Sequence, residues 1–509
     1  MNRENIVVLD FGGQYSHLIT RRIRDLSVYA ELLPYDTPSH EIELLNPSGI
    51  ILTGGPSSVY DDNSPKPDSK IFDLNIPILG ICYGLQIIVD AMGGSINRTN
   101  KREYGKATLS ILSDQKLFYG IDSTTDVWMS HGDATKILPD NFKSIASTDN
   151  SPYAAICSNN LYGVQFHPEV THTLDGTKIL KNFIYEICGC KGLWTMDSFV
   201  ESSINKIKSK VGNDSVLCAL SGGVDSSTVA LLLHKAIGDR LTCVFVDHGL
   251  LRKNEANHVL KIFDKLKIKI IFYNESDRFL NLLSDVTDPE IRRKLIGREF
   301  IKVFEEISNQ NGSFKWLAQG TLYPDVIESA STSGPAATIK THHNVGGLPE
   351  NLDFQLIEPL RELYKDEVRH VAKLIDLPDD ILKRHPFPGP GLAVRIIGKF
   401  NKEKLSICRH SSSIVEEELQ KSGYYDKVWQ AFAIVGDDKA VGVLGDNRKI
   451  GYIVTVRIVE SNDAMTADWV RLPYDILDNI SRRITNEVDN VSWVTYTISS
   501  KPPSTIEPQ

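Results

Sequence analysis

Apolar residues in the first part of the chain form short continuous runs that alternate with segments of helical periodicity. The run NIVVLDFG from residue 5 predicts a buried strand, HLITRRIRDL a helix, VYAELLPYD a second strand, and GIILTGGP a third strand that ends in a glycine turn. Continuous apolar runs are typical of strands that helices cover on both faces. The pattern therefore predicts a parallel α/β sheet.

The same alternation starts again after the segment CGCKGLW. SVLCAL predicts a strand, residues from about Val224 to Ala236 a helix, and LTCVFVDHG and KIIFYNES two further strands. Proline and glycine then accumulate in HPFPGPGLAV, through which neither a helix nor a central strand can run. Beyond this stretch, IGYIVTVRIVE and VSWVTYTIS predict strands with amphipathic helices between them.

These changes of pattern divide the chain into three expected domains. A chain of 509 residues is too long for one hydrophobic core, because single cores stop growing near ~250 to 300 residues. We expect two α/β domains, at residues 1–190 and 191–384, and a small α+β domain at residues 385–509.

Charge and cysteine usage narrow the class of protein. A formal net charge of −9 argues against a constitutive polyanion binder, so we expect no nucleic-acid partner. Seven cysteines without framework spacing predict reduced intracellular thiols. The first residues lead straight into a strand, and no apolar run approaches the ~18 residues of a membrane span. We therefore expect a cytoplasmic protein with no membrane partner.

The stretch GICYG predicts a reactive thiol. Gly80 and Gly84 flank Cys82 with the spacing that makes a strained turn between a strand and a helix, and the flanking IPIL and LQIIVDAM supply that strand and that helix. The partial positive charge at the helix N-terminus then favours a thiolate.

A thiol nucleophile needs a base and a stabiliser for the oxyanion. In GVQFHPEV, His167 and Glu169 lie two residues apart at the end of a predicted strand, so we expect both side chains on one face. Backbone N–H groups at Tyr83 and at Gly55 of the TGGP turn could form an oxyanion hole. A single cysteine is more often a core residue, but these three features together favour catalysis. His131 has no comparable partners, which predicts a structural or substrate-lining role.

DFGGQYSHLI, LTGGP, LGICYGLQ and GVQFHPE together resemble the class I glutamine amidotransferases, from about residue 5 to 187. The resemblance implies a glutaminase domain that frees ammonia from glutamine through a thioester. It also implies that Cys82 is the nucleophile, His167 the base and Glu169 the residue that orients the base.

A second chemical motif follows the strand SVLCAL. Consecutive small residues at the start of a helix expose backbone N–H groups to phosphate oxygens. The stretch SGGVDSS matches neither the G-x-x-x-x-G-K-[ST] pattern nor the G-x-G-x-x-G pattern, which predicts a different phosphate chemistry. We expect phosphate oxygens of a ligand, which the resemblance below implies to be ATP, to bind at Ser221, Gly222, Gly223, Val224, Asp225, Ser226 and Ser227.

SGGVDSS resembles the PP-loop of the N-type ATP pyrophosphatases, whose fold is adenine nucleotide α-hydrolase-like. The resemblance implies that ATP is a substrate and activates an acceptor oxygen as an adenylate. It also implies that Asp225 helps to hold Mg²⁺ and that Asp247 and His248 lie over the adenosine. Ammonia from the first domain would then displace the activated oxygen.

Further stretches bear on the acceptor. GTLYPDVIES, IKTHHNVGGLP, RHPFPGPGLAVR, DKVWQAF and SKPPSTIE resemble the GMP synthetase family, and this resemblance spans nearly the whole chain. It implies conversion of XMP, ATP and glutamine to GMP, AMP, pyrophosphate and glutamate. It further implies a C-terminal domain that forms a homodimer and helps to bind XMP.

The motifs of that family assign further residues to XMP, and a polar, glycine-bearing segment suits a lid. The residues expected at XMP are Arg293, Gln430, Lys501 and Glu507, and those expected in a mobile lid over the ATP site are Lys340, His342 and His343. Paired histidines are also compatible with a metal site, but no second cluster with ligand spacing lies nearby. The family commonly has Trp and Glu after the STIE-like stretch, whereas Pro508 and Gln509 follow here, so we assign these two residues no role.

Three alternatives stay open on the sequence. A glutamine-dependent NAD synthetase would carry a nitrilase-like glutaminase with a lysine in its triad, which GICYG and HPE do not resemble. A PP-loop enzyme that modifies tRNA would show a basic face and often a CxxC pair, whereas this chain is acidic and has no CxxC. A non-catalytic nucleotide sensor could keep the fold, although intact candidate residues at both sites argue against it.

Overall fold

The computed structural model describes residues 4–61, 63–113, 115–311, 314–330, 355–444, 447–461 and 466–509. The chain divides into two compact units, Met1–Phe199 and Val200–Gln509, and each is described by itself. The expected domain boundaries near residues 190 and 384 stay predictions. None of the helices in these ranges combines the length and the apolar character that a bilayer-spanning helix needs.

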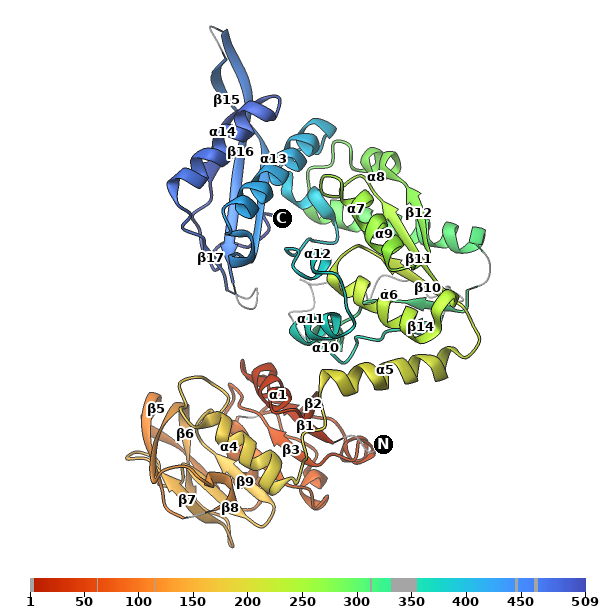
Figure 1. Ribbon diagram of the computed structural model, residues 1–509. Coiled ribbons are helices and arrows are strands. Elements are labelled where there is room, and N and C mark those ends of the chain that lie inside the picture. The colour runs from red at the N-terminus through yellow and green to blue at the C-terminus, as the bar shows by residue number, and fades with distance from the viewer. Residues whose placement is uncertain are drawn as a thin grey trace. The chain divides into compact units, whose positions relative to one another are not determined.

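The first unit is built on a nine-stranded mixed sheet with the order β2-β1-β3-β4-β9-β8-β7-β5-β6 (Figure 1). Five neighbouring strands are parallel: β1 (Asn5–Asp10), β2 (Tyr29–Pro34), β3 (Gly49–Leu52), β4 (Ile78–Ile81) and β9 (Leu161–Val164). They confirm the α/β class predicted from the continuous apolar runs, and every residue of β3 and β4 is buried.

The remaining four strands of this sheet are antiparallel, a feature that the apolar pattern did not predict. They are β5 (Ser95–Ile111), β6 (Thr124–Ile137), β7 (Lys143–Ser147) and β8 (Ala155–Ser158). The unit also contains α1 (Ser16–Asp25), α2 (Ser39–Leu44), α3 (Tyr83–Ala91), α4 (Gly176–Asn182), η1 (Ser69–Asp73), η2 (Lys116–Phe118) and η3 (Phe183–Ile187). Helix α3 packs on β3, β4 and β9, which places its N-terminus at the carboxyl ends of these strands.

The second unit begins with an all-parallel five-stranded sheet of order β12-β11-β10-β13-β14. Its strands are β10 (Val216–Leu220), β11 (Leu241–Asp247), β12 (Ile270–Asn274), β13 (Trp316–Ala318) and β14 (Gln355–Ile357). Its helices are α6 (Val224–Ile237), α7 (Glu255–Lys265), α8 (Ser276–Leu283), α9 (Pro289–Asn311), α10 (Tyr323–Ala330), α11 (Lys365–Leu374), α12 (Asp379–Leu382) and η4 (Gly238–Arg240). Helix α5 (Met196–Val211) runs across the boundary between the units. The predicted helix at about Val224 to Ala236 is confirmed to within one residue.

The C-terminal part of the second unit is the predicted small α+β arrangement. Strands β15 (Gln430–Leu444) and β16 (Asn447–Glu460) form a long antiparallel hairpin, and Figure 1 shows α13 and α14 beside it. The other elements are η6 (Gly391–Arg395), α13 (Lys402–Lys421), η7 (Tyr425–Lys427), β17 (Asp468–Trp469), α14 (Tyr474–Glu487) and β18 (Val491–Tyr496). Their buried faces join one hydrophobic core, which includes Val454 and Val456 of β16 and Ile480 and Ile484 of α14.

Candidate active sites

Cys82 occupies the turn between β4 and α3 in a strained backbone conformation, with φ 52° and ψ −101°. This combination is rare for a residue with a side chain and persists only where the surrounding structure enforces it. A Cβ on Gly80 would lie 2.4 Å from the backbone of Gly84, and a Cβ on Gly84 would lie 2.3 Å from the carbonyl oxygen of Leu52. The two glycines therefore let strand and helix approach closely enough to form this turn.

His167 and Glu169 form a hydrogen-bonded pair beside the thiol. The Nδ1 atom of His167 lies 2.7 Å from Oε1 of Glu169, and both side chains are buried. The side chain of His167 is hydrogen-bonded to Cys82. The expectation that the pair lies at a strand end is wrong, because β9 ends at Val164, and the two residues lie in the following turn.

The backbone of that turn fixes the imidazole ring. The N–H of His167 donates to the carbonyl oxygen of Trp128 on β6 (3.0 Å), and the hydroxyl of Thr173 donates to the carbonyl oxygen of His167 (2.6 Å). The ring also meets Tyr15 edge to face, with centroids 5.3 Å apart. The antiparallel strand β6, which the sequence pattern did not reveal, thus positions the base.

The electrostatics of the pair favour a protonated imidazole. Burial by itself lowers the pKa of His167, but its hydrogen bonds to Cys82 and Glu169 and the negative charges of these two groups raise the pKa to about 10. An imidazolium at neutral pH stabilises a thiolate beside it. The arrangement can therefore supply a thiolate nucleophile and, on the same histidine, a proton for the leaving amine.

The two residues expected in the oxyanion hole lie near the thiol. Tyr83 is the first residue of α3, where backbone N–H groups have no acceptor within the helix. The turn after β3 is held by Thr53, whose hydroxyl accepts from the N–H of Phe11 (3.0 Å) and donates to the carbonyl oxygen of Gly54 (3.0 Å). A Cβ on Gly54 would come within 3.0 Å of the His167 ring, so this turn borders the base. The roles of Gly55 and Tyr83 stay predictions.

Other residues around the thiol were missed at the level of sequence. The amide of Gln165 donates to the sulfur of Cys82 (3.7 Å), and the amide of Gln86 donates to the carbonyl oxygen of Asp133 (3.2 Å). Gln165 stands two residues before His167 in the same motif, and that proximity is the signal that could have found it. His131 is buried, with Nε2 3.3 Å from Oε2 of Glu103.

The glycine-rich loop joins β10 to α6, as the sequence predicts. The hydroxyl of Ser226 accepts from the N–H of Ser221 (3.2 Å) and lies 2.9 Å from the hydroxyl of Ser221. Gly222 has φ 77°, which a residue with a side chain rarely adopts. The loop is thereby held compact at a helix N-terminus, the geometry that binds phosphate oxygens.

Two polar atoms beside this loop are buried without a hydrogen-bond partner among the described residues, Oδ1 of Asp225 and Oγ of Ser227. The other carboxylate oxygen of Asp225 lies 3.4 Å from Nζ of Lys365. A buried, unpaired carboxylate oxygen is costly unless a ligand completes it. At the end of β11, Asp247 accepts from the N–H of Gly249 (2.8 Å), and His248 is buried, which lowers its pKa to about 4.

The C-terminal tail gathers the residues expected at XMP. The amide of Gln430 donates to Oε1 of Glu507 (2.5 Å), and Nη2 of Arg293 donates to the backbone oxygen of Gln509 (2.7 Å). Lys501 pairs through its backbone with Ala467. The structure thus joins Gln430 to Glu507 directly, whereas Arg293 contacts the last residue of the tail and Lys501, within the tail, pairs with Ala467.

Two buried arginines that the sequence reasoning missed hold this tail. Arg457 on β16 donates to the carbonyl oxygens of Ser499 (2.7 Å) and Thr505 (2.8 Å). Arg395 donates to both carboxylate oxygens of Glu507, at 2.8 and 3.1 Å. Each arginine interrupts an otherwise apolar run, IVTVRIV or GLAVRII, and a charge in such a run is a usable signal. The expected lid residues Lys340, His342 and His343 lie outside the described residues.

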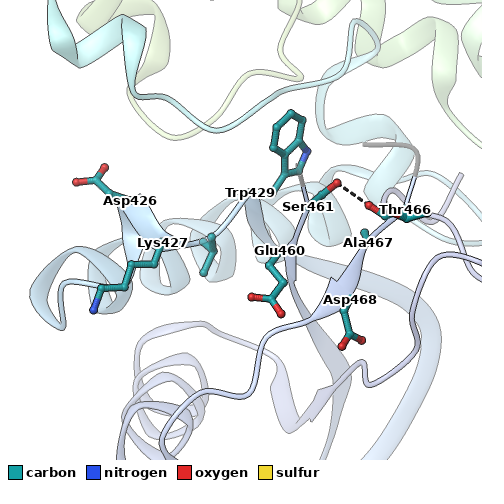
Figure 2. Close-up of a pocket in the computed structure, with 9 residues that line it drawn as sticks. Asp426, Lys427, Trp429, Glu460, Ser461, Thr466, Ala467 and Asp468 are labelled. Carbon is teal, nitrogen blue, oxygen red and sulfur yellow. Dashed lines mark hydrogen bonds between the residues drawn. The ribbon is translucent and has the colours of Figure 1, made fainter. Parts of the chain in front are cut away.

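A cavity of about 720 Å³ lies at the ends of β15 and β16. Figure 2 shows the residues that line it and the hydrogen bond from the hydroxyl of Ser461 to the carbonyl oxygen of Thr466 (2.6 Å). Its charged lining residues are Asp426, Lys427, Glu460 and Asp468. Three carboxylates against one ammonium group oppose a phosphate, so we do not place XMP in this cavity.

Three family models match separate parts of the chain. Glutamine amidotransferase class-I matches residues 7–187, the PP-loop domain residues 196–283, and the GMP synthase C terminal domain residues 417–508. The glutamine-hydrolysing GMP synthase of Carboxydothermus hydrogenoformans is 55% identical over 505 residues, which cover 99% of this chain and 99% of its own. The chain belongs to the glutamine-hydrolysing GMP synthases.

Other GMP synthases are similar over the same extent. That of Caldanaerobacter subterraneus subsp. tengcongensis is 54% identical over 510 residues, covering 100% of this chain and 99% of its own. That of Synechococcus sp. is 53% identical over 517 residues, covering 100% and 97%. Within this GMP synthase family member, Cys82, His167 and Glu169 all lie in the amidotransferase match, and the glycine-rich loop lies in the PP-loop match.

Proposed function

We propose that this protein makes GMP from XMP, with ATP and glutamine as the other substrates and AMP, pyrophosphate and glutamate as the other products. The observation that carries the proposal is that a hydrogen-bonded Cys82–His167–Glu169 triad and an SGGVDSS loop occur in one chain that is more than half identical to GMP synthases over its full length. The relatives and the three matched families do not favour an NAD synthetase, a tRNA-modifying enzyme or a nucleotide sensor.

The first step belongs to the thiol site. The thiolate of Cys82 attacks the side-chain amide carbon of glutamine, and N–H groups at Tyr83 and Gly55 stabilise the oxyanion. His167, oriented by Glu169, gives its proton to the departing ammonia. Water then hydrolyses the thioester to glutamate, with His167 as the base. We assign these steps to a glutaminase domain at residues 1–190.

The second step belongs to the glycine-rich loop. Residues 221–227 grip the pyrophosphate end of ATP, and the XMP oxygen that will be replaced attacks the α-phosphorus, which forms an adenylate and releases pyrophosphate. Ammonia then attacks the carbon that bears this oxygen, and AMP leaves with the oxygen to give GMP. Asp225 fits a Mg²⁺ ligand, because its Oδ1 atom is buried without a partner among the described residues. The ion would neutralise charge on the pyrophosphate. Since the described residues contain no cluster of three or more metal-ligating side chains, phosphate oxygens would supply other ligands.

XMP is held by the tail and its surroundings in this proposal. Gln430 and Glu507 already lie in hydrogen-bond contact, and Arg293 and Lys501 add positive charge for the phosphate. Lys340, His342 and His343 would close over the ATP site. We assign ATP activation to a domain at residues 191–384, and XMP binding and dimerisation to residues 385–509.

Exposed apolar side chains support a homodimer. Val441, Val443 and Ile450 on the β15–β16 hairpin are 55%, 74% and 67% exposed, and Trp493 on β18 is 54% exposed. Val441 lies opposite Ile450 in the hairpin, and the indole of Trp493 donates to the carbonyl oxygen of Val441 (3.1 Å). We call these four residues the hairpin patch. A contiguous apolar patch of this kind is typical of an interface between proteins.

All seven cysteines are free thiols, which supports a reducing compartment such as the cytoplasm. The direct test of the function is to mix the purified protein with XMP, ATP, Mg²⁺ and glutamine, follow the ultraviolet absorbance, and identify the products by chromatography. GMP and AMP in equal amounts are the expected result. AMP without GMP would mean another acceptor, and no reaction would favour a non-catalytic sensor.

A further inference from the structure

Six charged residues of the second unit lie between the glycine-rich loop and the C-terminal tail, in two ion-paired groups that meet at the ring of Phe387, and we call them the arginine–glutamate network. Its members are Arg252, Glu255, Arg384, Arg395, Glu416 and Glu507. Three guanidinium groups face three carboxylates, so the formal charges cancel. Such a balanced set can stay buried where a single charge could not.

At the loop end, the network touches the backbone of the expected ATP site. Nη1 of Arg384 donates to the carbonyl oxygen of Gly222 (3.4 Å), and Nη2 of the same residue lies 3.0 Å from Oε1 of Glu255. Glu255 is 4% exposed and also accepts from the N–H of Arg252 (2.9 Å). The carbonyl oxygen of Gly222 therefore accepts a hydrogen bond from an arginine that pairs with the buried Glu255.

At the tail end, the network holds a residue expected at XMP. Arg395, whose side chain is 1% exposed, binds the carboxylate of Glu507 with two hydrogen bonds, and Gln430 donates to the same carboxylate. A bidentate arginine fixes both the position and the plane of a carboxylate. Arg395 thus sets where Glu507 and Gln430 can meet a ligand.

The two ends meet around Glu416 on α13 and the ring of Phe387. The Oε1 atom of Glu416 lies 3.5 Å from Nε of Arg252. The guanidinium groups of Arg252 and Arg395 both lie over the ring of Phe387, at 4.5 and 5.1 Å from its centroid. Glu416 has no contact with Gly222, Gln430 or Glu507 among the hydrogen bonds and ion pairs of the described residues.

Stability alone does not account for this arrangement. Buried ion pairs are often no more stabilising than apolar residues of the same volume, because the cost of removing the charges from water offsets their attraction. Breaking one pair, however, leaves an uncompensated buried charge. Displacement of one member away from its partner is therefore disfavoured.

We propose that the arginine–glutamate network is a positioning device that couples the ATP loop to the XMP tail, so that occupancy of one nucleotide site favours binding at the other. The inference rests on the proposed function. It assigns positioning roles to Arg252, Glu255, Arg384, Arg395 and Glu416. The coupling holds the XMP oxygen in line with the α-phosphorus of ATP, because the ATP loop and the XMP tail both contact the same set of buried charges.

The test measures the dissociation constant of XMP by titration calorimetry, with and without saturating α,β-methylene-ATP, an analogue that resists cleavage between its α- and β-phosphates. The ratio of the two constants is the coupling factor, which we expect to be about fivefold or more in the wild type. Glu416→Gln removes the central charge and keeps its shape, and we expect it to bring the factor close to one. The matched control is Glu417→Gln on the same helix, because Glu417 pairs with Arg483 outside the network.

A wild-type factor of one, or an unchanged factor in Glu416→Gln, would overturn the proposal. If Glu416→Gln fails to fold, a cycle of Arg384→Lys, Arg395→Lys and the double variant replaces it, because lysine keeps the charge and loses the fork. Non-additive effects on the coupling factor support the network, and additive effects contradict it. GMP formation by the wild type with ammonium salt is measured first, so that a failure of the function is distinguished from a failure of the coupling.

Discussion

The thiol of Cys82 depends on neighbours that are themselves held by the backbone. The strained turn aims the side chain at His167, and Glu169 and the carbonyl of Trp128 keep the imidazole in place. No part of the glycine-rich loop takes part in this arrangement. The two chemistries therefore separate at the level of single residues.

The first prediction tests that separation. Cys82→Ala should abolish GMP formation from glutamine and leave formation from ammonium salt within about twofold of the wild type, because the nucleophile serves only to release ammonia. GMP is measured by chromatography with each nitrogen source. Cys157→Ala, which removes a half-buried thiol of the same unit, should keep both activities. Loss of the ammonium-dependent rate in Cys82→Ala would show that the thiol also supports the synthetase.

The second prediction concerns pH. Because the pKa of His167 is raised to about 10, its imidazolium is present below that pH and is lost as the pH rises through it. The ring nitrogen signals of His167 in an NMR titration should therefore stay those of an imidazolium from about pH 6.5 to 9.

His167→Ala should slow the alkylation of Cys82 by iodoacetamide at pH 7.5 by about tenfold or more, because it removes the imidazolium that favours the reactive form of the thiol. Peptide mass spectrometry of labelled Cys82 gives the rates. His172→Ala serves as the control, since His172 packs on Trp128 and has no contact with the thiol among the described residues. A neutral His167 ring between pH 6.5 and 9, or an unchanged alkylation rate in His167→Ala, would refute the imidazolium assignment.

At the scale of elements, two strand–turn–helix connections carry the chemistry. The turn from β4 to α3 requires glycine on both sides of the nucleophile, and the turn from β10 to α6 uses hydroxyl groups to close a phosphate loop. Both connections lie at the carboxyl ends of parallel strands, where α/β sheets commonly bind ligands. A substitution in the first connection should affect stability, and a substitution in the second should affect the Mg²⁺ requirement.

The third prediction concerns the first connection. A Cβ in Gly84→Ala would meet the backbone of Leu52 at 2.3 Å, so α3 and β3 must separate. We expect a loss of about 1 to 3 kcal/mol in the free energy of unfolding of the first unit, measured by urea denaturation, and a loss of glutaminase activity. Gly297→Ala on α9 has open space at that position and should stabilise the second unit by about 0.5 to 1 kcal/mol. An unchanged stability of Gly84→Ala would contradict the packing argument.

The fourth prediction concerns the second connection. Asp225→Asn removes the negative charge of the carboxylate whose Oδ1 atom is buried without a partner among the described residues, and we expect the Mg²⁺ concentration for half-maximal GMP synthesis to rise by about tenfold, or about 1.4 kcal/mol. Rates are measured with ammonium salt so that glutaminase does not contribute. Asp239→Asn, at an exposed position after the other end of α6, should leave the requirement unchanged. The magnesium assignment is rejected if both variants behave like the wild type.

At the scale of the whole molecule, the hairpin patch has no cover within the described chain. Glutamate within an apolar interface would bury an unpaired charge, which costs more than an interface of ordinary affinity can supply. The fifth prediction is that the wild type sediments at twice the chain mass and that Val443→Glu sediments at the chain mass, in analytical ultracentrifugation. Tyr119→Glu, at an exposed site of the first unit, should stay dimeric. A monomeric wild type would reject the homodimer.

The sequence by itself determined the parallel strands, the thiol turn, the His-x-Glu pair and the glycine-rich loop, because each of these depends on residues close together in the chain. Continuous apolar runs mark buried strands, and glycine at fixed spacing marks a close approach of backbone segments that a Cβ would block. The antiparallel strands β5 to β8 escaped this reasoning, and so did Gln165 beside the thiol.

Only the tertiary structure decided how the tail is held. Arg395 and Glu507 are 112 positions apart, and Arg293 and Gln509 are 216 apart, so no local period relates them. A buried arginine in an apolar run shows that a partner must exist, but only the fold brings that partner within hydrogen-bond distance. Local backbone requirements are therefore legible in sequence, whereas the pairing of buried charges is decided when distant segments pack together.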